Sequence, residues 1–389
     1  MKVRTEIYWE SLNKYGEELC GDKVETVQNP NETIMVMADG LGSGVKANIL
    51  STLTSKIAVT MLKQGLSIEE TIKTIMATLP ICKVRKIAYS TFTIIRVDSA
   101  GNCYIAEYGN PPVMLLRGGK VLKLYGDERE IEGKQVTEYR FKTQIGDVII
   151  TLSDGVVHAG VGGILNLGWQ WKNIAEYIEK IAQVEHTLGS LVKLLSAVTT
   201  NLYMEKPGDD ATIAALKIIK PEFATVFTGP PQDPKDDEKV IERLMKSEGK
   251  KIVCGGTAAQ ITARILGREI ITSTEFVDAN IPPTAKIEGI DLVTEGVLTL
   301  AHTRELLLRY MDPAVQYKQL RELERKDGAS RLAKLLLSAT DITFLIGKAI
   351  NPAHQNPDFP KELSIKLNIV KEIGETLEKI GKNIEMIYY

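Results

Sequence analysis

The stretch Val36-Met37-Ala38-Asp39-Gly40-Leu41-Gly42-Ser43-Gly44 joins two different sequence patterns. Before it, the apolar run from Thr33 to Ala38 is typical of a buried strand. After it, apolar residues recur with helical spacing from Val45 to Leu62. Asp39 therefore ends a strand, where its carboxylate is held in a fixed place. Gly40 lets backbone and ligand approach closely.

Acidic residues stand beside glycine at three further predicted turns, which are Gly21-Asp22, Asp154-Gly155 and Gly208-Asp209-Asp210. Carboxylate oxygens grouped at strand ends suit Mg²⁺ or Mn²⁺. Two such ions close together bind a phosphoryl group and lower the pKa of a bridging water, which gives a hydroxide nucleophile. These residues favour metal-assisted phosphoester hydrolysis, in which Asp39 and Asp154 serve catalysis.

Each of these features also has a structural interpretation. Asp-Gly is a common turn dipeptide, and Asp often caps helices. The glycines from Gly40 to Gly44 could form a phosphate-binding loop, but they match neither the dinucleotide-binding nor the P-loop spacing. His158, soon after Asp154, is a weaker catalytic candidate, because a lone histidine near a loop is usually an ordinary polar residue.

Length and composition limit the class of protein. A chain of 389 residues predicts two domains. A net charge of -2 argues against binding to nucleic acid or to an anionic membrane. We expect no signal peptide and no membrane span. The scattered cysteines predict reduced thiols in the cytoplasm; they are Cys20, Cys82, Cys103 and Cys254. A homodimer is compatible with the sequence, which does not decide the oligomeric state.

We place the domain boundary near Pro221, which gives domains of residues 1–220 and 221–389. In the first, strands at both ends enclose helical stretches, which predicts an α+β sandwich of sheets flanked by helices. In the second, strands and helices alternate, which predicts an α/β domain with a largely parallel sheet.

The second domain has one suggestive turn. The strand predicted from Lys251 to Cys254 leads into Gly255-Gly256-Thr257 and then a helix, so backbone N–H groups point at the turn. Glu295 follows another predicted strand. Because parallel sheets bind ligands at the carboxyl ends of their strands, these four residues predict a small anionic ligand. Ordinary strand-to-helix turns without a ligand explain the pattern equally well.

Six motifs occur in order along residues 1–219. They are Cys20-Gly21-Asp22, Ala38 to Gly44, Tyr89-Ser90-Thr91, Tyr108-Gly109-Asn110-Pro111-Pro112, Leu152-Ser153-Asp154-Gly155 and Asp209-Asp210-Ala211-Thr212. With these motifs the segment resembles the bacterial branch of the protein phosphatase 2C (PPM) serine/threonine phosphatases, of the stage II sporulation protein E type. The resemblance implies a β-sandwich flanked by helices, with two Mn²⁺ or Mg²⁺ ions.

The resemblance also implies roles for individual residues. Asp39 would bridge both metals and the Gly40 carbonyl would bind one of them. The remaining metal ligands would be Asp22, Asp154 and Asp209, with Asp210 close by. The implied substrate is phosphoserine or phosphothreonine in a protein, such as a regulator resembling an anti-sigma-factor antagonist.

Two further expectations follow from the resemblance. The arginine that holds phosphate in eukaryotic members has no clear equivalent, so Arg4 and Lys46 are the candidates to replace it. The helices from Val45 to Leu79 would shift to complete the metal site, although plain amphipathic packing on the sheet explains them as well.

The sequence therefore predicts a metal-dependent protein serine/threonine phosphatase that acts through a metal-activated water. Its C-terminal domain would sense a ligand and regulate it. The alternative is a non-catalytic signalling scaffold with a small-ligand-binding C-terminal domain, and the intact acidic positions favour the enzyme. A third option is a nucleotide-binding enzyme built on the C-terminal domain.

Overall fold

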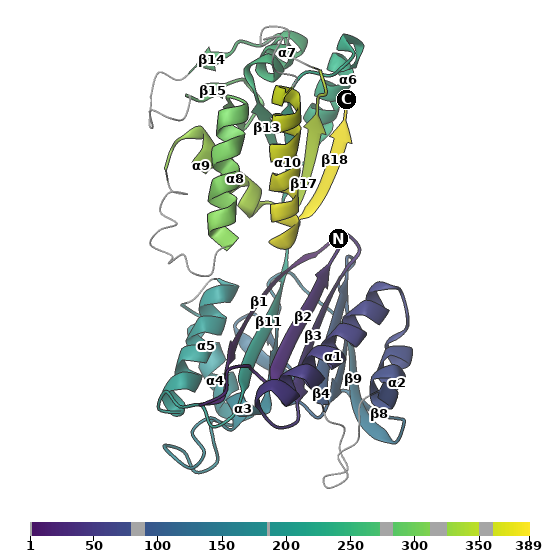
Figure 1. The fold of residues 1–389 in the computed structure, drawn as a ribbon, viewed down its shortest axis with the longest axis vertical. Coiled ribbons are helices and arrows are strands. Elements are labelled where there is room, and N and C mark those ends of the chain that lie inside the picture. The colour runs from purple at the N-terminus through teal and green to yellow at the C-terminus, as the bar shows by residue number, and fades with distance from the viewer. Residues whose placement is uncertain (1, 79–89, 185–186, 273–282, 312–324, 350–360) are drawn as a thin grey trace. The chain divides into compact units, whose positions relative to one another are not determined.

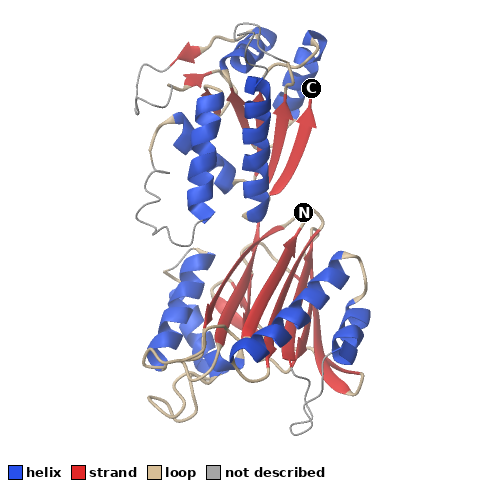
Figure 2. Cartoon of the chain, in the orientation of Figure 1, coloured by secondary structure: helices blue, strands red, loops and turns tan. Residues whose placement is uncertain are grey.

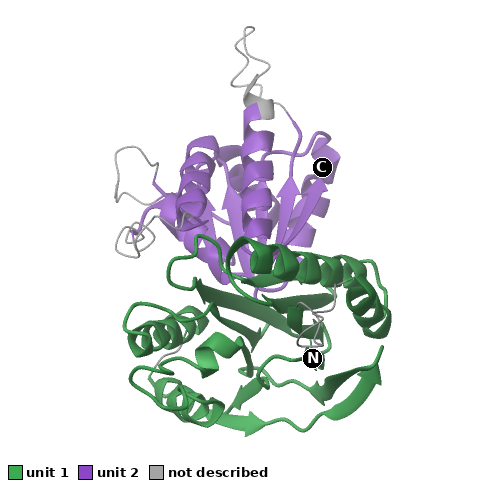
Figure 3. Ribbon diagram, turned by 60° about the horizontal axis from the view of Figure 1, so that its bottom comes forward, with its two compact units in different colours: residues 1–220 green, residues 221–389 purple. Residues whose placement is uncertain are grey.

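The computed structural model describes residues 2–78, 90–184, 187–272, 283–311, 325–349 and 361–389 (Figure 1). Runs of consecutive strands dominate residues 1–220, whereas helices and strands largely alternate after residue 221 (Figure 2). The chain forms two compact units (Figure 3). Unit 1 comprises Met1–Lys220 and unit 2 comprises Pro221–Tyr389. Cys82 and Tyr89 lie outside the described residues.

Unit 1 consists of two antiparallel sheets packed face to face, with helices on both outer faces (Figure 1). The six-stranded sheet has the order β2 (Asp22–Gln28), β3 (Glu32–Gly40), β4 (Ser90–Asp98), β5 (Asn102–Tyr108), β9 (Lys134–Lys142), β8 (Asp127–Ile131). The five-stranded sheet has the order β1 (Arg4–Leu12), β11 (Ala211–Ile219), β10 (Val148–Leu152), β6 (Met114–Arg117), β7 (Lys120–Lys123). This arrangement confirms the predicted α+β sandwich.

The helices of unit 1 divide between the two sheets. Helices α1 (Gly44–Lys63) and α2 (Ile68–Thr78) pack on the six-stranded sheet. The other three pack on the five-stranded sheet; they are α3 (Asp154–Val157), α4 (Trp171–Ile181) and α5 (Leu188–Leu202).

Strand β3 is buried on both faces, which explains its continuous apolar run. Ile34, Val36 and Ala38 pack against α1 and α2. Met35 and Met37 pack against the five-stranded sheet. A strand covered on both sides does not alternate apolar and polar residues. Asp39 is therefore carried on a strand with rigid neighbours on each side.

The helical region after Gly44 is divided by a capping box. The Ser67 N–H donates to Glu70 Oε2 (2.9 Å), and the Glu70 N–H donates to Ser67 Oγ (3.1 Å). This reciprocal pair satisfies two amides that a helix start otherwise leaves unpaired. A capping box is thus present at the start of α2.

Unit 2 has a mixed seven-stranded sheet. Its order is β14 (Ile271–Thr272), β15 (Ala285–Lys286), β16 (Leu292–Thr294), β13 (Lys250–Cys254), β12 (Phe223–Thr228), β17 (Asp341–Ile346), β18 (Asn383–Tyr388). The last five strands are parallel, and β14 and β15 pair antiparallel at one edge. The predicted α/β class with a largely parallel sheet is confirmed.

Helices cover both faces of this sheet. Three pack on one face; they are α8 (Val297–Met311), α9 (Gly328–Ser338) and α10 (Lys361–Lys379). On the other face lie α6 (Asp237–Lys246), which follows the short 3₁₀ turn Pro234–Asp236, and α7 (Gly256–Leu266).

The sequence patterns missed several elements. Strands β2, β8 and β18 and helix α6 were not predicted, because their short or charged sequences carry little apolar periodicity. The strand predicted from Glu269 to Thr272 is only Ile271–Thr272, and the helix predicted from Asn368 to Lys382 runs from Lys361 to Lys379. Pairing with neighbouring strands and packing on the sheet decide these elements.

A buried glutamate holds the turn after β5. The Val113 N–H donates to Glu107 Oε1 (2.6 Å), and the Tyr139 hydroxyl donates to Oε2 (2.7 Å). Burial raises the pKa of Glu107 from 4.5 to about 7, against the lowering effect of these two donors. The turn with the sequence Gly109-Asn110-Pro111-Pro112 is thereby joined to the sheet.

We predict that Glu107 makes the stability of unit 1 depend on pH. Because its folded pKa is raised, its contribution is complete below its unfolded pKa, near 4.5, and is lost as the pH rises towards 7. The loss amounts to about 3 kcal/mol. Urea unfolding of the metal-free protein measures the free energy of unfolding at pH 4.5 and at pH 8, about one unit above the folded pKa of Glu107. The difference between the two free energies should be smaller for Glu107→Gln than for the wild type. Glu128→Gln, on exposed β8, is the control, and parallel pH profiles would refute the prediction.

Candidate metal centre

Two of the predicted carboxylates face each other within the six-stranded sheet. Strand β2 begins at Asp22, and β3 ends one residue after Asp39. The antiparallel register of these strands sets Asp22 directly opposite Asp39. Directly opposite residues on one face of a sheet have side chains within contact distance. The pairing of β2 with β3 therefore creates the first half of the site.

The five-stranded sheet brings the other three carboxylates together. Leu152 at the end of β10 pairs with Ile213 near the start of β11, so Asp154 and Asp210 lie at the same end of the sheet. The Thr212 N–H donates to Ser153 Oγ (2.8 Å) and joins the two chain segments. The two sheets meet here, because a Cβ added to Gly21 would lie 2.6 Å from Asp210 Oδ2.

Glycines make these close approaches possible. A Cβ on Gly40 would lie 2.0 Å from the backbone oxygen of Ala47 in α1. A Cβ on Gly155 would lie 2.0 Å from the backbone oxygen of Asp210. Any side chain at either position would force backbone apart. The glycine of each Asp-Gly pair thus serves packing as well as the turn.

The clustered carboxylates repel one another. Burial, followed by the charges of Asp22 and the three carboxylates of the other sheet, raises the pKa of Asp39 to about 9. Burial is also the main reason that the pKa of Asp22 rises to about 7, with Asp210 and Asp154 adding to it. Burial and the charge of Asp154 raise the pKa of Asp209.

At this cluster, three buried carboxylate oxygens have no hydrogen-bond partner among the described residues. They are both oxygens of Asp22 and Oδ2 of Asp210. The hydroxyls of Ser153 and Thr212 lie near enough to lower the pKa of Asp22, but neither has hydrogen-bond geometry to it. Unsatisfied oxygens that repel each other have the chemistry of a divalent-cation site.

The side chains of the proposed metal ligands do not yet surround a common point. Within the part of the chain that the structure describes, no three His, Cys, Asp or Glu side chains are already close enough to hold one metal ion. The donors thus fit the chemistry of a hard divalent cation, while their geometry requires the side chains to draw in around it.

The other predicted residues lie as follows. The Gly40 N–H donates to the Gly21 carbonyl (3.2 Å), which keeps the two acidic turns adjacent. His158 is exposed at the end of α3, and its backbone N–H donates to the Asp154 carbonyl (2.9 Å). Lys46 is exposed in the first turn of α1.

Arg4 lies at the wrong end of the sandwich to hold phosphate. Its guanidinium donates to the Pro30 carbonyl (3.0 Å), at the turn between β2 and β3. It begins β1, whereas Leu12 at the other end of that strand pairs with Ala211 beside the carboxylates. Eight residues of extended strand span about 26 Å.

Sequence reasoning missed a cation beside the carboxylates. The Lys14 N–H donates to Asp210 Oδ1 (3.0 Å), and the charge of Lys14 lowers the pKa of Asp209. Its only sequence signal is its position shortly before Gly21-Asp22, in a stretch without periodic structure.

In unit 2, the predicted ligand residues occupy two neighbouring turns. Gly255, Gly256 and Thr257 follow β13, and Glu295 follows β16. The two strands pair in parallel, with Cys254 opposite Thr294. The two turns therefore lie side by side.

Comparison with known proteins places the first unit in a family. Residues 29–219 match the family described as Stage II sporulation protein E (SpoIIE). This segment belongs to the SpoIIE family. Unit 1 thus contains a SpoIIE-type domain, which is the type that its sequence motifs resemble. The match does not include unit 2.

Two curated relatives share the SpoIIE segment. Stage II sporulation protein E of Bacillus subtilis (strain 168) is 28% identical over 151 residues, which is 37% of this chain and 18% of that protein. Its counterpart from Priestia megaterium is 26% identical over 148 residues, which is 37% of this chain and 25% of that protein. The chain therefore spans a quarter or less of the length of these relatives.

One solved structure is that of the PP2C phosphatase domain and a fragment of the regulatory domain of SpoIIE from Bacillus subtilis. It is 21% identical, with a TM-score of 0.48, and the match covers 56% of this chain and 63% of that one.

We predict that Gly40→Ala destabilises the SpoIIE domain by about 2 kcal/mol or more, because the new Cβ collides with helix backbone that cannot move aside cheaply. Gly163→Ala is the matched control, since its Cβ would meet only the Gly160 oxygen, at 3.7 Å. Urea unfolding of both variants measures the difference. Equal urea midpoints for Gly40→Ala and Gly163→Ala would contradict the prediction, because they would mean that α1 can move away from residue 40 at little cost.

Proposed function

We propose that this chain hydrolyses phosphoserine or phosphothreonine in a protein, with two divalent ions, Mn²⁺ or Mg²⁺, held by its clustered carboxylates. The observation that carries this proposal is the gathering of five carboxylates from both sheets at one end of the sandwich, with buried oxygens that lack partners. Membership of the SpoIIE family supports the same chemistry.

Asp39 is our candidate for the ligand shared by both ions. Asp39 lies directly opposite Asp22 on the neighbouring strand, and the charges of all four other carboxylates raise its pKa. The remaining ligands would be the Gly40 carbonyl and the side chains of Asp22, Asp154 and Asp209, with Asp210 close by.

The bound ions would polarise the phosphoryl group and lower the pKa of an attacking water. The chain's own contribution is to position that chemistry. Strands β2 and β3 hold Asp22 and Asp39 in fixed register. The Lys14 ammonium, whose charge already acts on Asp209, is our candidate for binding the substrate phosphate. Lys14→Met should therefore raise KM more than it lowers kcat, and an unchanged KM would exclude that role.

The partner we propose is a phosphorylated regulator resembling an anti-sigma-factor antagonist, as the family resemblance suggests. We also propose that unit 2 regulates the phosphatase. A cytoplasmic location is compatible with the free thiols of Cys20, Cys103 and Cys254. None of the described helices is long and apolar enough to cross a membrane.

The test is hydrolysis of para-nitrophenyl phosphate by the full chain, with and without Mn²⁺ or Mg²⁺. We expect metal-dependent activity that Asp39→Asn reduces by at least a hundredfold, because the variant removes one charge from both metal positions. Asp127→Asn, the same change at an exposed position of β8, should retain activity. Inactivity with every divalent metal would favour the signalling scaffold instead.

A thermal unfolding assay separates metal binding from catalysis. Added Mn²⁺ should raise the Tm of the wild type, since binding to the folded state stabilises it. In EDTA, Asp39→Asn should unfold at a higher temperature than the wild type, because it removes repulsion that burial intensifies. A lower Tm for metal-free Asp39→Asn would contradict the electrostatic account of the site.

A further inference from the structure

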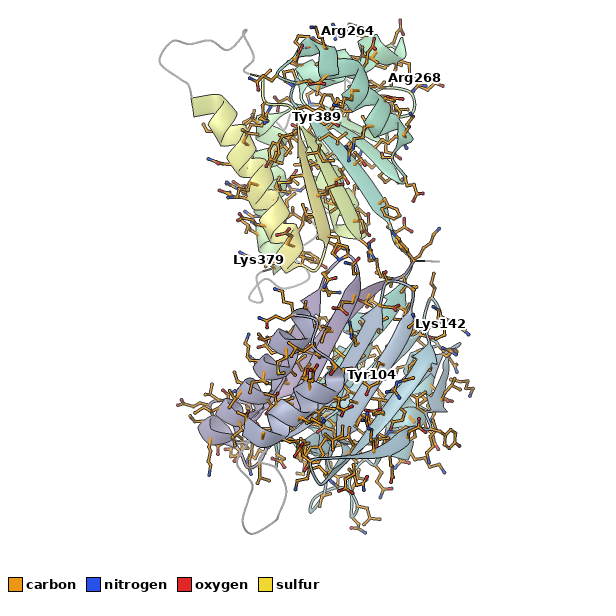
Figure 4. All side chains as sticks on the ribbon, turned by 90° about the vertical axis from the view of Figure 1, so that its right-hand side faces the viewer. Tyr104, Lys142, Arg264, Arg268, Lys379 and Tyr389 are labelled. Atoms are coloured by element: carbon orange, nitrogen blue, oxygen red, sulfur yellow. The ribbon has the colours of Figure 1, made fainter. Side chains whose placement is uncertain are left out.

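The parallel strands of unit 2 end at one common level. Thr228, the last residue of β12, lies opposite Cys254 of β13 and Ile346 of β17. Cys254 in turn lies opposite Thr294 of β16. Tyr389 follows β18 at the same edge (Figure 4). We call this the carboxyl edge, formed by the turns that begin at Gly229, Gly255, Glu295 and Gly347.

The chain reverses its direction of winding at this edge. From β12 it passes through α6 to β13 on one side, and from β16 it passes through α8 and α9 to β17 on the other side. Strands β12 and β17 are therefore the topological switch point of the sheet. Open α/β sheets bind ligands outside the carboxyl ends of their strands at such a point.

A largely buried lysine reaches the switch point. Lys366 of α10 has its Nζ 3.4 Å from the Gly347 carbonyl. A Cβ added to Gly229 would lie 1.9 Å from that Nζ, so the ammonium lies against the turn after β12. Burial lowers the pKa of Lys366, and no carboxylate contributes to the shift. Among the described residues, this partly buried ammonium has one long hydrogen bond and no carboxylate partner.

Two buried polar groups without partners among the described residues lie along the same edge. Thr228 is fully buried, and its hydroxyl has no hydrogen-bond partner among the described residues. Strand alternation places it on the sheet face of Val226, which α10 also covers. Oε2 of Glu295 is likewise buried and unpartnered. Buried polar atoms are normally satisfied by protein, water or ligand.

Glycines leave open space beside the turn after β13. A Cβ on Gly256 would meet no atom within 4 Å, and one on Gly255 would meet only the Gly296 Cα, at 3.9 Å. Helix α7 begins here, so its first N–H groups have no partners within the helix. Thr228 and Glu295 follow strands separated by β13, about 10 Å apart between backbones.

We propose that the carboxyl edge of unit 2 binds a small phosphorylated sugar, free or as part of a nucleotide. Its phosphate contacts Lys366 and the Thr228 hydroxyl, its body lies over Gly255 and Gly256, and its hydroxyls donate to Glu295. The Glu295 carboxylate lies two strands away from the phosphate along the edge, and this separation limits the repulsion between them. This site is independent of the phosphatase chemistry proposed for unit 1.

Isothermal titration calorimetry tests the site with ribose 5-phosphate, AMP and inorganic phosphate as probes. The full-length Asp39→Asn chain in EDTA is used, so that the metal centre does not take up phosphate. We expect ribose 5-phosphate or AMP to bind at least tenfold more tightly than inorganic phosphate. If ribose 5-phosphate binds more tightly than AMP, the ligand is a free sugar phosphate; if AMP binds more tightly, it is a nucleotide.

Variants then identify the residues. Lys366→Met should weaken binding at least tenfold, whereas Lys371→Met, at an exposed position of the same helix, should not. Glu295→Gln should weaken the binding of the sugar phosphate more than it weakens the binding of inorganic phosphate. Lys366→Met should keep its unfolding temperature without ligand, because it replaces a desolvated cation by an apolar side chain of similar length. Equal binding by the two lysine variants, or no binding of any probe, would overturn the proposal.

Adding the bound probe to the phosphatase assay of the wild-type chain tests the regulation proposed for unit 2. A changed rate supports it, and an unchanged rate at saturating probe overturns it without affecting the binding site itself.

Discussion

Electrostatic repulsion among five carboxylates is the constraint around which unit 1 is built. Desolvation and like charge together raise the pKa values of Asp39 and Asp22, so the folded domain bears a cost at neutral pH. A divalent cation converts that cost into attraction, because each carboxylate then has a partner. Metal binding to such a site contributes directly to the free energy of folding. In the function that we propose, stability and chemistry would therefore depend on the same side chains.

The two-sheet architecture is what makes this concentration of charge feasible. No single strand or helix carries the site: Asp22 and Asp39 come from one sheet, and Asp154, Asp209 and Asp210 come from the other. Hydrophobic packing between the sheets holds the two groups together against their repulsion. Glycines beside the acidic residues remove the Cβ atoms that would keep the backbones apart.

Unit 1 gathers negative charge, whereas unit 2 holds a positive charge at the carboxyl edge of its sheet. At its carboxyl edge, Lys366 has no carboxylate partner among the described residues, and the polar side chains of Thr228 and Glu295 have buried oxygens without a hydrogen bond there. The parallel sheet brings these groups together because all its strands end at one edge. In both units, buried polar groups without partners among the described residues support the ligands that we propose, a divalent cation for the first and a phosphorylated sugar for the second.

The sequence alone determined the elements with strong local signals. Strand β3, helix α1 and strand β13 contain the ranges that the sequence predicted for them, and the acidic motifs identified the family. Only the tertiary structure decided that Asp22 begins a strand opposite Asp39, that Arg4 lies far from the carboxylates, and that Lys366 reaches Gly229. Periodicity reports which face of an element is buried. Strand register and contacts between distant residues follow instead from packing the whole chain.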